Sequence, residues 1–199
     1  LGQAEIKTLP YLDIFQLCED IIKIKEITQN LYQDFQVNFS SQPYENDCGS
    51  SLQINFSLMQ NDDFLFAKNH EQESRYLQKS IAGALKFTKN MMIIFAPKPE
   101  DYARFDLELN RNLHKKQKYT APVNISWGYN NRTALIRIPA TQKISERRLE
   151  FRLAANSADI YLISTFFLLA VLQGIKMEGE LPREIYGNSF DEQYNLEAL

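Results

Sequence analysis

The sequence predicts an α+β fold in which helices flank a mainly antiparallel sheet. Three observations lead to this prediction: long segments with helical apolar spacing, short runs of alternating apolar and polar residues, and turn residues between those runs. Short strands joined by turns, with helices grouped at their flanks, are typical of this class. The 199 residues, 44% of them hydrophobic, are enough for one sizeable core and indicate a single domain.

The first two predicted elements are a helix and a strand. Residues Asp13–Phe35 predict a helix, because Asp13 can cap its start and apolar residues recur at helical spacing. In Leu52–Leu58 the residue types alternate. One face of this strand is therefore apolar and carries Leu52, Ile54, Phe56 and Leu58.

A second helix and two further strands follow. Gln72–Ile94 predicts a helix whose inward residues are Leu77, Ile81, Leu85 and Met92. The polar stretch that includes Lys115–Lys118 is interpreted as a solvated loop. Val123–Gly128 and Thr133–Ile138 alternate as strands do, and the turn Tyr129–Arg132 joins them.

The last two predicted elements are a strand and a helix. Arg148, Glu150 and Arg152 alternate with Leu149, Phe151 and Leu153, so the strand has one charged and one apolar face. Ala158–Ile175 is apolar enough to raise the question of a membrane span. Its polar residues favour a buried core helix instead; they are Asp159, Ser164, Thr165 and Gln173.

Composition excludes several classes of partner. The net charge of −3 and the pI near 5.5 give no basic surface, so neither nucleic acid nor an anionic membrane is expected. Cys18 and Cys48 are too few for a disulfide framework or a zinc site, which favours a reduced, cytoplasmic setting. His70 and His114 lie in polar surroundings and are interpreted as surface residues.

The charged face of the last strand is the candidate site. Guanidinium groups bind carboxylates and phosphates through two parallel hydrogen bonds, and a carboxylate between two cations stays ionised and can hold a divalent metal. Arg132 and Arg137 precede this strand and can add positive charge to the same face. On the pattern alone, a surface strand with salt bridges is the favoured interpretation, because exposed Arg-x-Glu-x-Arg is common.

Several motifs together resemble the glutamine synthetase family. Ala121–Pro139 (APVNISWGYNNRTALIRIP) and Arg147–Arg152 (RRLEFR) are similar to the family's AP-x-x-x-x-W-G-x-x-N-R-[ST]-A-x-I-R-I-P and R-R-x-E-x-R runs. The other matches follow in the family's order and span nearly the whole chain. They are Gly2–Ile6 (GQNEI in the family), Asp47–Leu58 (the D-x-G-S-G strand), Tyr102–Arg104 (the end of NSYKR) and Ile185–Phe190 (IYGNAF).

The resemblance implies an ATP-dependent ligase that joins glutamate to ammonia through γ-glutamyl phosphate, with two Mg²⁺ or Mn²⁺ ions. It implies metal ligands at Glu5, Glu150 and Gln53, and catalytic arginines at Arg132 and Arg137 that meet the transferred phosphate. For glutamate it implies Arg104 and Arg152 with backbone contacts from Gly49. For the nucleotide it implies Asn55, Ser57 and Arg137.

The chain departs from the family's pattern at positions that bind the metal, the nucleotide and ammonium in the family. Gln53 and Asn55 replace two histidines, of which the first is a metal ligand, and an amide is a weaker ligand than imidazole. Thr120 stands where the family has a glutamate that takes a proton from ammonium, and threonine is a poor base. Gln42 replaces a lysine, the loop Asn110–Lys118 looks lengthened, and NPYL is replaced by Asp159–Leu162.

The resemblance also implies a larger assembly. The family completes each site with an N-terminal β-grasp domain from a neighbouring subunit, and we expect residues 1–199 to be one partial catalytic domain without it. We therefore expect a homo-oligomer for the full-length protein and inactivity for this piece alone. Two alternatives stay open: a γ-glutamyl ligase for another amine, and a catalytically degenerate homologue that senses a ligand or serves assembly. Tyr194 lies near a regulatory tyrosine of some bacterial relatives, but its flanking residues differ.

Overall fold

The computed structural model describes residues 3–31, 36–68 and 72–199. They divide into two compact units, Leu1–Val37 and Asn38–Leu199, and each unit is described by itself. Gly2, residues 32–35 at the end of the first predicted helix, and His70 lie outside the described residues.

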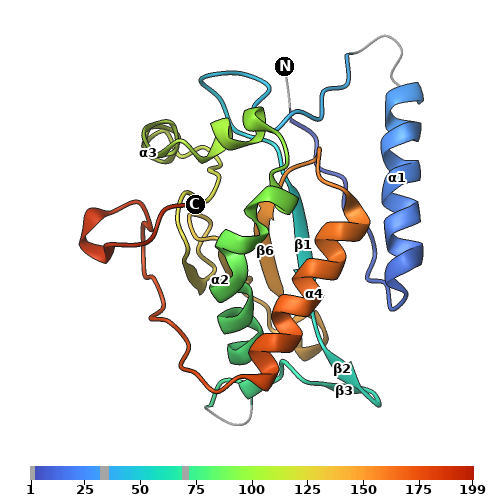
Figure 1. Ribbon diagram of the computed structural model, residues 1–199, viewed down its shortest axis with the longest axis vertical. Coiled ribbons are helices and arrows are strands. Elements are labelled where there is room, and N and C mark those ends of the chain that lie inside the picture. The colour runs from blue at the N-terminus through green and yellow to red at the C-terminus, as the bar shows by residue number, and fades with distance from the viewer. Residues whose placement is uncertain (1–2, 32–35, 69–71) are drawn as a thin grey trace. The chain divides into compact units, whose positions relative to one another are not determined.

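The first unit contains one helix, α1 (Ile14–Leu31), preceded by an extended segment (Figure 1). The Asp13 carboxylate accepts hydrogen bonds from the amides of Phe15 (2.9 Å) and Gln16 (3.2 Å). Amides of the first helical turn have no acceptor within the helix, and Asp13 supplies one. The predicted helix start at Asp13 is therefore confirmed.

The second unit is built on a four-stranded sheet with the order β1-β6-β5-β4. Strand β6 (Leu149–Ala154) pairs antiparallel with β1 (Leu52–Phe56) on one side and with β5 (Ile136–Ile138) on the other. Strand β4 (Trp127–Tyr129) pairs with β5 in parallel. The predicted mainly antiparallel sheet is therefore confirmed, with one parallel pair at its end.

The parallel pair departs from the simple turn that the sequence predicts between these strands. Trp127 lies beside Ile136, and the Asn130 amide donates to Ile138 O at 2.8 Å, so the two strands run in the same direction and the loop between them returns to the start of β4 instead of forming a hairpin. The predicted strand Val123–Gly128 is also shorter, because its first residues bond elsewhere. Leu199 N donates to Val123 O (3.1 Å), and Ile125 N donates to Glu197 O (2.8 Å).

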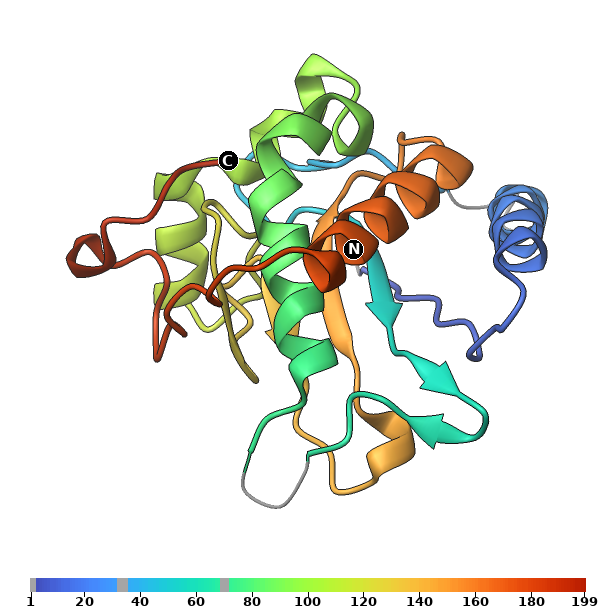
Figure 2. The same ribbon diagram turned by 60° about the horizontal axis from the view of Figure 1, so that its bottom comes forward.

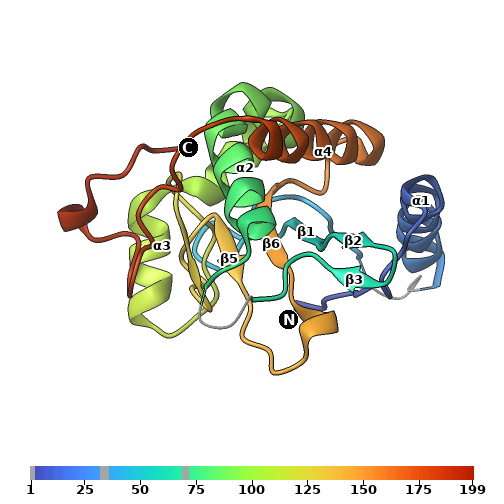
Figure 3. The same cartoon turned by 90° about the horizontal axis from the view of Figure 1, so that it is seen from below.

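Two long helices cover one face of the sheet, α2 (Arg75–Phe95) and α4 (Ile160–Lys176) (Figures 2 and 3). All four residues predicted to face inward from α2 are buried. Phe151 of β6 lies between the rings of Phe95 (5.5 Å) and Phe167 (5.3 Å), which joins both helices to the sheet. In the part of the chain that the structure describes, no helix combines the length and apolarity of a membrane span.

The remaining elements are short. The stretch interpreted as a loop contains helix α3 (Leu107–Lys115), which begins because the Asp106 side chain accepts from Leu109 N at 2.6 Å. The loop interpretation was therefore wrong for residues 110–115, although Lys116–Lys118 are exposed. The hairpin β2 (Met59–Gln60) and β3 (Asp63–Phe64) was not predicted, nor were the 3₁₀ turns η1 (Pro99–Phe105), η2 (Ile144–Glu146) and η3 (Glu192–Tyr194).

Candidate functional site

The face of the sheet opposite α2 and α4 carries a row of polar side chains. Asn55 of β1 lies directly across from Glu150 of β6, and Glu150 lies across from Arg137 of β5. Neighbouring positions in register share a face, so the three side chains lie side by side. The opposite row of Ile54, Phe151 and Ile136 belongs to the apolar face. We call Asn55, Glu150, Arg137 and Arg152 the polar face.

Glu150 lies between two guanidinium groups. Its Oε2 accepts from Arg137 Nη1 at 3.1 Å, and its Oε1 lies 3.5 Å from Arg152 Nε. Both partners and Glu150 are nearly buried, with side chains that are 8–11% exposed. Arg137 also donates to Asn130 Oδ1 at 2.7 Å. Glu150 therefore offsets part of the positive charge that the two guanidinium groups bring to this face.

Arg152 is held by backbone oxygens. Its Nη2 donates to Thr120 O (2.8 Å), and its Nη1 donates to Ala134 O (2.9 Å) and to Arg132 O. Burial lowers the pKa of Arg152 to about 10, and Glu150 opposes that shift. The guanidinium therefore still carries its proton at neutral pH.

Arg104 lies beneath the loop that carries Gly49, and only 2% of it is exposed. Its Nη2 donates to Leu153 O, and its guanidinium lies 4.3 Å from the centre of the Phe105 ring. Burial, together with the positive charge of Arg152, lowers the pKa of Arg104 to about 9. The Arg104 guanidinium is thus buried and bonded to the backbone, near enough to Arg152 for the two positive charges to interact.

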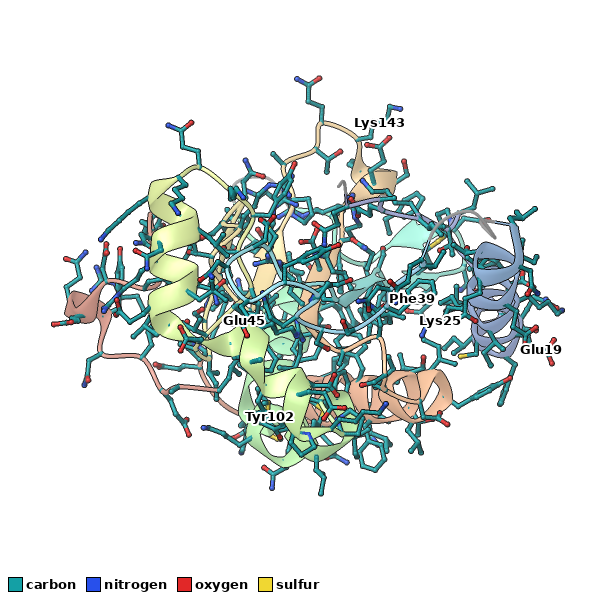
Figure 4. All side chains as sticks on the ribbon, turned by 90° about the horizontal axis from the view of Figure 1, so that it is seen from above. Glu19, Lys25, Phe39, Glu45, Tyr102 and Lys143 are labelled. Carbon is teal, nitrogen blue, oxygen red and sulfur yellow. The ribbon has the colours of Figure 1, made fainter. Side chains whose placement is uncertain are left out.

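The loop above Arg104 packs so closely that position 49 has no room for a side chain. A β-carbon there would lie 2.9 Å from the Arg104 Cβ and 3.0 Å from Ser41 O. Ser41 in turn donates to Asp101 Oδ1 at 2.6 Å, so the loop that includes Ser41 and Gly49 lies beside η1. Glu45 and Tyr102 mark these two segments in Figure 4. The glycine thus allows the loop to close over Arg104.

Arg132 is exposed, and its guanidinium lies 5.5 Å from the centre of the Tyr119 ring. Thr120, next to Tyr119, is 7% exposed, and its hydroxyl donates to Arg132 O at 3.3 Å. Arg132 O also accepts from Arg152 Nη1, so the Thr120 hydroxyl is bonded to a backbone oxygen beside the polar face.

The other predicted site residues are more dispersed. Gln53 and Ser57 are exposed, on β1 and just after it, and Asn55 accepts from Arg148 Nε at 2.9 Å. Glu5 belongs to the Leu1–Val37 unit, where it is exposed and lies 3.7 Å from Lys7. The structure thus brings Asn55, Glu150, Arg137 and Arg152 together in one unit, whereas Glu5 is described apart from them.

A buried network that sequence reasoning missed holds the Arg132 backbone. Asn131 Nδ2 donates to Ile185 O (3.0 Å) and Gly187 O (2.9 Å), and its Oδ1 accepts from the amide and hydroxyl of Thr133. Thr133 in turn accepts two hydrogen bonds from Ser189, one from its amide to the Thr133 hydroxyl and one from its hydroxyl to Thr133 O, both of 2.9 Å. Ala121–Pro139 and Ile185–Phe190, which contain these residues, both resemble family motifs, but their spacing in the sequence does not predict that they are in contact.

A second missed cluster joins the start of α2 to the sheet. Glu73 Oε2 accepts from Arg147 Nη2 at 2.5 Å and from the Tyr129 hydroxyl. Burial and the hydrogen bond to Glu73 raise the pKa of the Tyr129 hydroxyl. Glu73 is 74 positions from Arg147, so no local pattern predicts the contact.

The donor set of the polar face does not by itself fit a two-metal centre. Glu150 is its one carboxylate, and both oxygens already face guanidinium groups. Within residues 3–31, 36–68 and 72–199 no three His, Cys, Asp or Glu side chains come together as metal ligands do.

Comparison with known proteins identifies the family. The model of the glutamine synthetase catalytic domain matches residues 1–198. Gamma-glutamylputrescine synthetase PuuA of Escherichia coli is 27% identical over 195 residues, and the match covers 96% of this chain and 39% of that protein. Glutamine synthetase of Clostridium saccharobutylicum is 30% identical over 193 residues, with coverage of 95% and 41%. The chain thus spans about two fifths of these relatives.

Solved structures agree at the level of the fold. The GmaS/ADP complex superposes with a TM-score of 0.77 at 22% identity, covering 95% of this chain and 43% of that one. Glutamine synthetase of Plasmodium falciparum gives a TM-score of 0.73 at 23% identity, covering 86% and 32%. Because the family model matches residues 1–198, the chain belongs to the glutamine synthetase catalytic-domain family.

Proposed function

We propose that the chain is part of an ATP-dependent ligase that joins glutamate to an amine through γ-glutamyl phosphate. The observation that carries this proposal is the polar face, where Arg137 and Glu150 are in register and Arg132 lies exposed on the adjoining loop. Phosphoryl transfer depends mainly on positioning and on charge neutralisation, which such arginines supply. The family generally uses ATP and divalent metals, and its members commonly form oligomers; we propose both for the full-length protein, with a cytoplasmic location.

In this proposal Arg132 and Arg137 contact the phosphate groups, and Asn55 and Ser57 contact the nucleotide. When bound, Mg²⁺ would neutralise the charge of the phosphate oxygens, with Glu150 as one ligand and Gln53 and Glu5 as further candidates. The polar face does not complete such a centre, and we therefore derive no step through the metal.

Thr120 favours an amine other than ammonia as the substrate. Its hydroxyl is bonded to Arg132 O and offers no carboxylate to bind or deprotonate ammonium. A relative named gamma-glutamylputrescine synthetase matches 96% of the chain, which is consistent with a larger amine. A non-catalytic homologue is the second candidate, favoured by Gln53 and Asn55 in place of two histidines.

Calorimetry and an assay of ADP release test the proposal on the protein as its gene encodes it. ATP is titrated with and without Mg²⁺, and ADP release is then measured with glutamate plus ammonium, methylamine or putrescine. We expect Mg²⁺-dependent ATP binding and glutamate-dependent ADP release, with more release for an organic amine than for ammonium. Binding without ADP release, or absence of Mg²⁺·ATP binding, contradicts the ligase and supports the non-catalytic homologue.

A variant locates the activity on the polar face. Arg137→Gln removes the guanidinium that faces Glu150, and we expect it to weaken Mg²⁺·ATP binding about tenfold. Arg183→Gln removes an exposed arginine elsewhere and should leave binding unchanged. Equal affinity of both variants would place the nucleotide away from the polar face.

A further inference from the structure

A cavity of about 200 Å³ lies beside the segment that follows α4, which is drawn in red in Figure 1. Leu85 of α2 and residues 125–127 at the start of β4 form one side of it, and residues between 182 and 196 form the other. None of the lining residues belongs to the polar face. The lining is mainly apolar and includes Leu85, Ile125, Trp127, Ile185, Tyr194 and Leu196.

Hydrogen bonds hold this segment against β4 at both ends of the cavity. Trp127 Nε1 donates to Pro182 O (2.7 Å), and Ile185 N donates to Trp127 O (2.9 Å). At the other end Ile125 N donates to Glu197 O (2.8 Å). The residues between these contacts, which include η3, are thus tied down on either side of the cavity.

The buried polar groups of the lining side chains already have partners in the protein. The Ser126 hydroxyl donates to Asn124 Oδ1 at 2.7 Å, and the indole N–H of Trp127 is bonded as described above. An apolar cavity whose polar groups are satisfied stays dry, and about 150 Å³ is enough for benzene. Trp127 and Tyr194 both line the cavity, and aromatic rings interact favourably with one another. The lining therefore favours a single aromatic ring.

A positive charge lies where the cavity meets solvent. Arg183 lines the cavity and is exposed. Two neighbouring carboxylates have other partners, since Glu184 accepts from Tyr129 N at 3.1 Å and Glu197 lies 3.9 Å from Lys89 Nζ. A guanidinium group binds a carboxylate through two parallel hydrogen bonds. Arg183 thus favours a ligand with a carboxylate.

We propose that this cavity is a binding site for a small aromatic carboxylate, a molecule with one ring and a short chain that ends in a carboxylate. The ring enters the apolar cavity beside Trp127 and Tyr194, and the carboxylate binds Arg183. The site does not depend on the proposed function, because it shares no residue with the polar face.

The fluorescence of Trp127, the one tryptophan, tests this site in the full chain. The probes are phenylacetate, phenylethanol and phenethylamine, which carry the same ring and end in a negative, a neutral and a positive group. We expect a saturable change with phenylacetate at a Kd on the order of 1 mM, about fivefold weaker binding of phenylethanol, and no saturable change with phenethylamine. Thermal unfolding is a second readout, because a ligand of the folded state raises the Tm.

Two variants locate the ligand, each with a matched control. Leu196→Phe fills part of the cavity and should weaken phenylacetate binding at least about tenfold, whereas Leu162→Phe makes the same change at a position of α4 that is 49% exposed and should not. Arg183→Gln should reduce the affinity for phenylacetate to that for phenylethanol. Arg75→Gln, which removes an exposed arginine at the start of α2, should leave it unchanged.

Three results would overturn the proposal. The first is the absence of both a fluorescence change and a rise in Tm at about 10 mM phenylacetate. The second is binding of phenylethanol or phenethylamine as tight as that of phenylacetate, or an affinity for phenylacetate that Arg183→Gln leaves unchanged. The third is a Leu196→Phe protein with wild-type circular dichroism that binds phenylacetate as the wild type does. Arg183 is exposed, so its variant decides the class of ligand even where Leu196→Phe does not fold.

Discussion

The two arginines beside Glu150 differ in how firmly their side chains are held. Arg152 is bonded to three carbonyl oxygens, whereas Arg137 is bonded to Glu150 and to the Asn130 side chain. A cation that binds Glu150 has to replace at least one of these guanidinium groups, since like charges repel at this distance. Arg137 has fewer backbone ties, and we therefore expect it to be the group that moves toward an anionic ligand.

Asp101 is the residue whose charge secures the loop over Arg104. Burial by itself raises the pKa of this carboxyl, but hydrogen bonds from Ser157 (2.5 Å), Ser41 (2.6 Å) and the Lys98 amide (3.0 Å) outweigh it. The pKa of Asp101 therefore lies below its ordinary value of 3.8. Its stabilising contribution is complete above the unfolded-state pKa and is lost as the pH falls through the folded-state pKa.

Because the pKa of Asp101 is lowered in the folded protein, we expect acid to reduce the stability of the wild type. The variant Asp101→Asn should lose this part of the pH dependence. Urea unfolding between pH 7 and pH 2.5 should show the difference in free energy of unfolding between wild type and variant shrinking below about pH 4. Ser41→Ala and Ser157→Ala should each remove part of the same pH dependence. A variant Asp101→Asn whose stability falls with acid as steeply as the wild type would contradict this account.

At the scale of elements, α2 and α4 cross at a pair of glycines. A β-carbon on Gly83 would lie 2.3 Å from Ala170 O, and one on Gly174 would lie 2.3 Å from Lys79 O. These neighbours are backbone atoms, which cannot rotate away. The two glycines thus set the closest approach of the helices that cover the sheet (Figure 3).

Replacing either glycine with alanine should destabilise the fold, although alanine is the better helix former. Helix propensity favours the alanine variants by about 1 kcal/mol, but overpacking against backbone should exceed it and leave a net loss of about 2 kcal/mol. Urea unfolding measures this loss. Gly179→Ala is the control, because a β-carbon there has nothing within 4 Å. Unchanged stability of Gly83→Ala would mean that the helices can separate freely.

The elements predicted correctly from sequence are those that local patterns determine. A helix is predicted over Ala158–Ile175, and Asp159 caps α4 by accepting from the amides of Tyr161 (2.9 Å) and Leu162 (3.0 Å). Its predicted burial is confirmed for one side only, because Leu162 and Leu169 are 49% and 47% exposed. The alternation in β6 predicted its faces correctly, since Leu149, Phe151 and Leu153 are fully buried. Such signals lie within a few residues of the element itself.

What the sequence did not predict depends on distant contacts. The parallel pairing of β4, its shortened length and the bonds of Arg152 all involve partners at least eight residues away. Alternation placed Arg152 on the same face as Glu150, but it carries no information about which acceptors a guanidinium reaches. The resemblance supplied the candidate residues, and the structure shows that Arg104 and Arg152 face backbone oxygens.

At the scale of the whole molecule, the sheet and its covering helices belong to one unit. All four strands of the sheet, α2, α4 and the polar face lie within Asn38–Leu199. The buried residues at the end of this unit are part of its core, because Ile185 is 4% and Phe190 3% exposed. Trp127 Nε1 also donates to Pro182 O at 2.7 Å. The two ends of the chain should therefore differ in their importance for folding.

Removing residues 1–37 should leave a cooperatively folding protein, whereas removing residues 183–199 should not. The first deletion removes α1 and no strand, so we expect a retained unfolding transition and a circular dichroism loss matching one helix of 18 residues. The second removes fewer residues but leaves the Asn131 and Thr133 side chains without their partners in a buried site. Thermal unfolding monitored through Trp127, the one tryptophan, compares the two. A first deletion that abolishes the transition would show that the sheet cannot fold without the N-terminal unit.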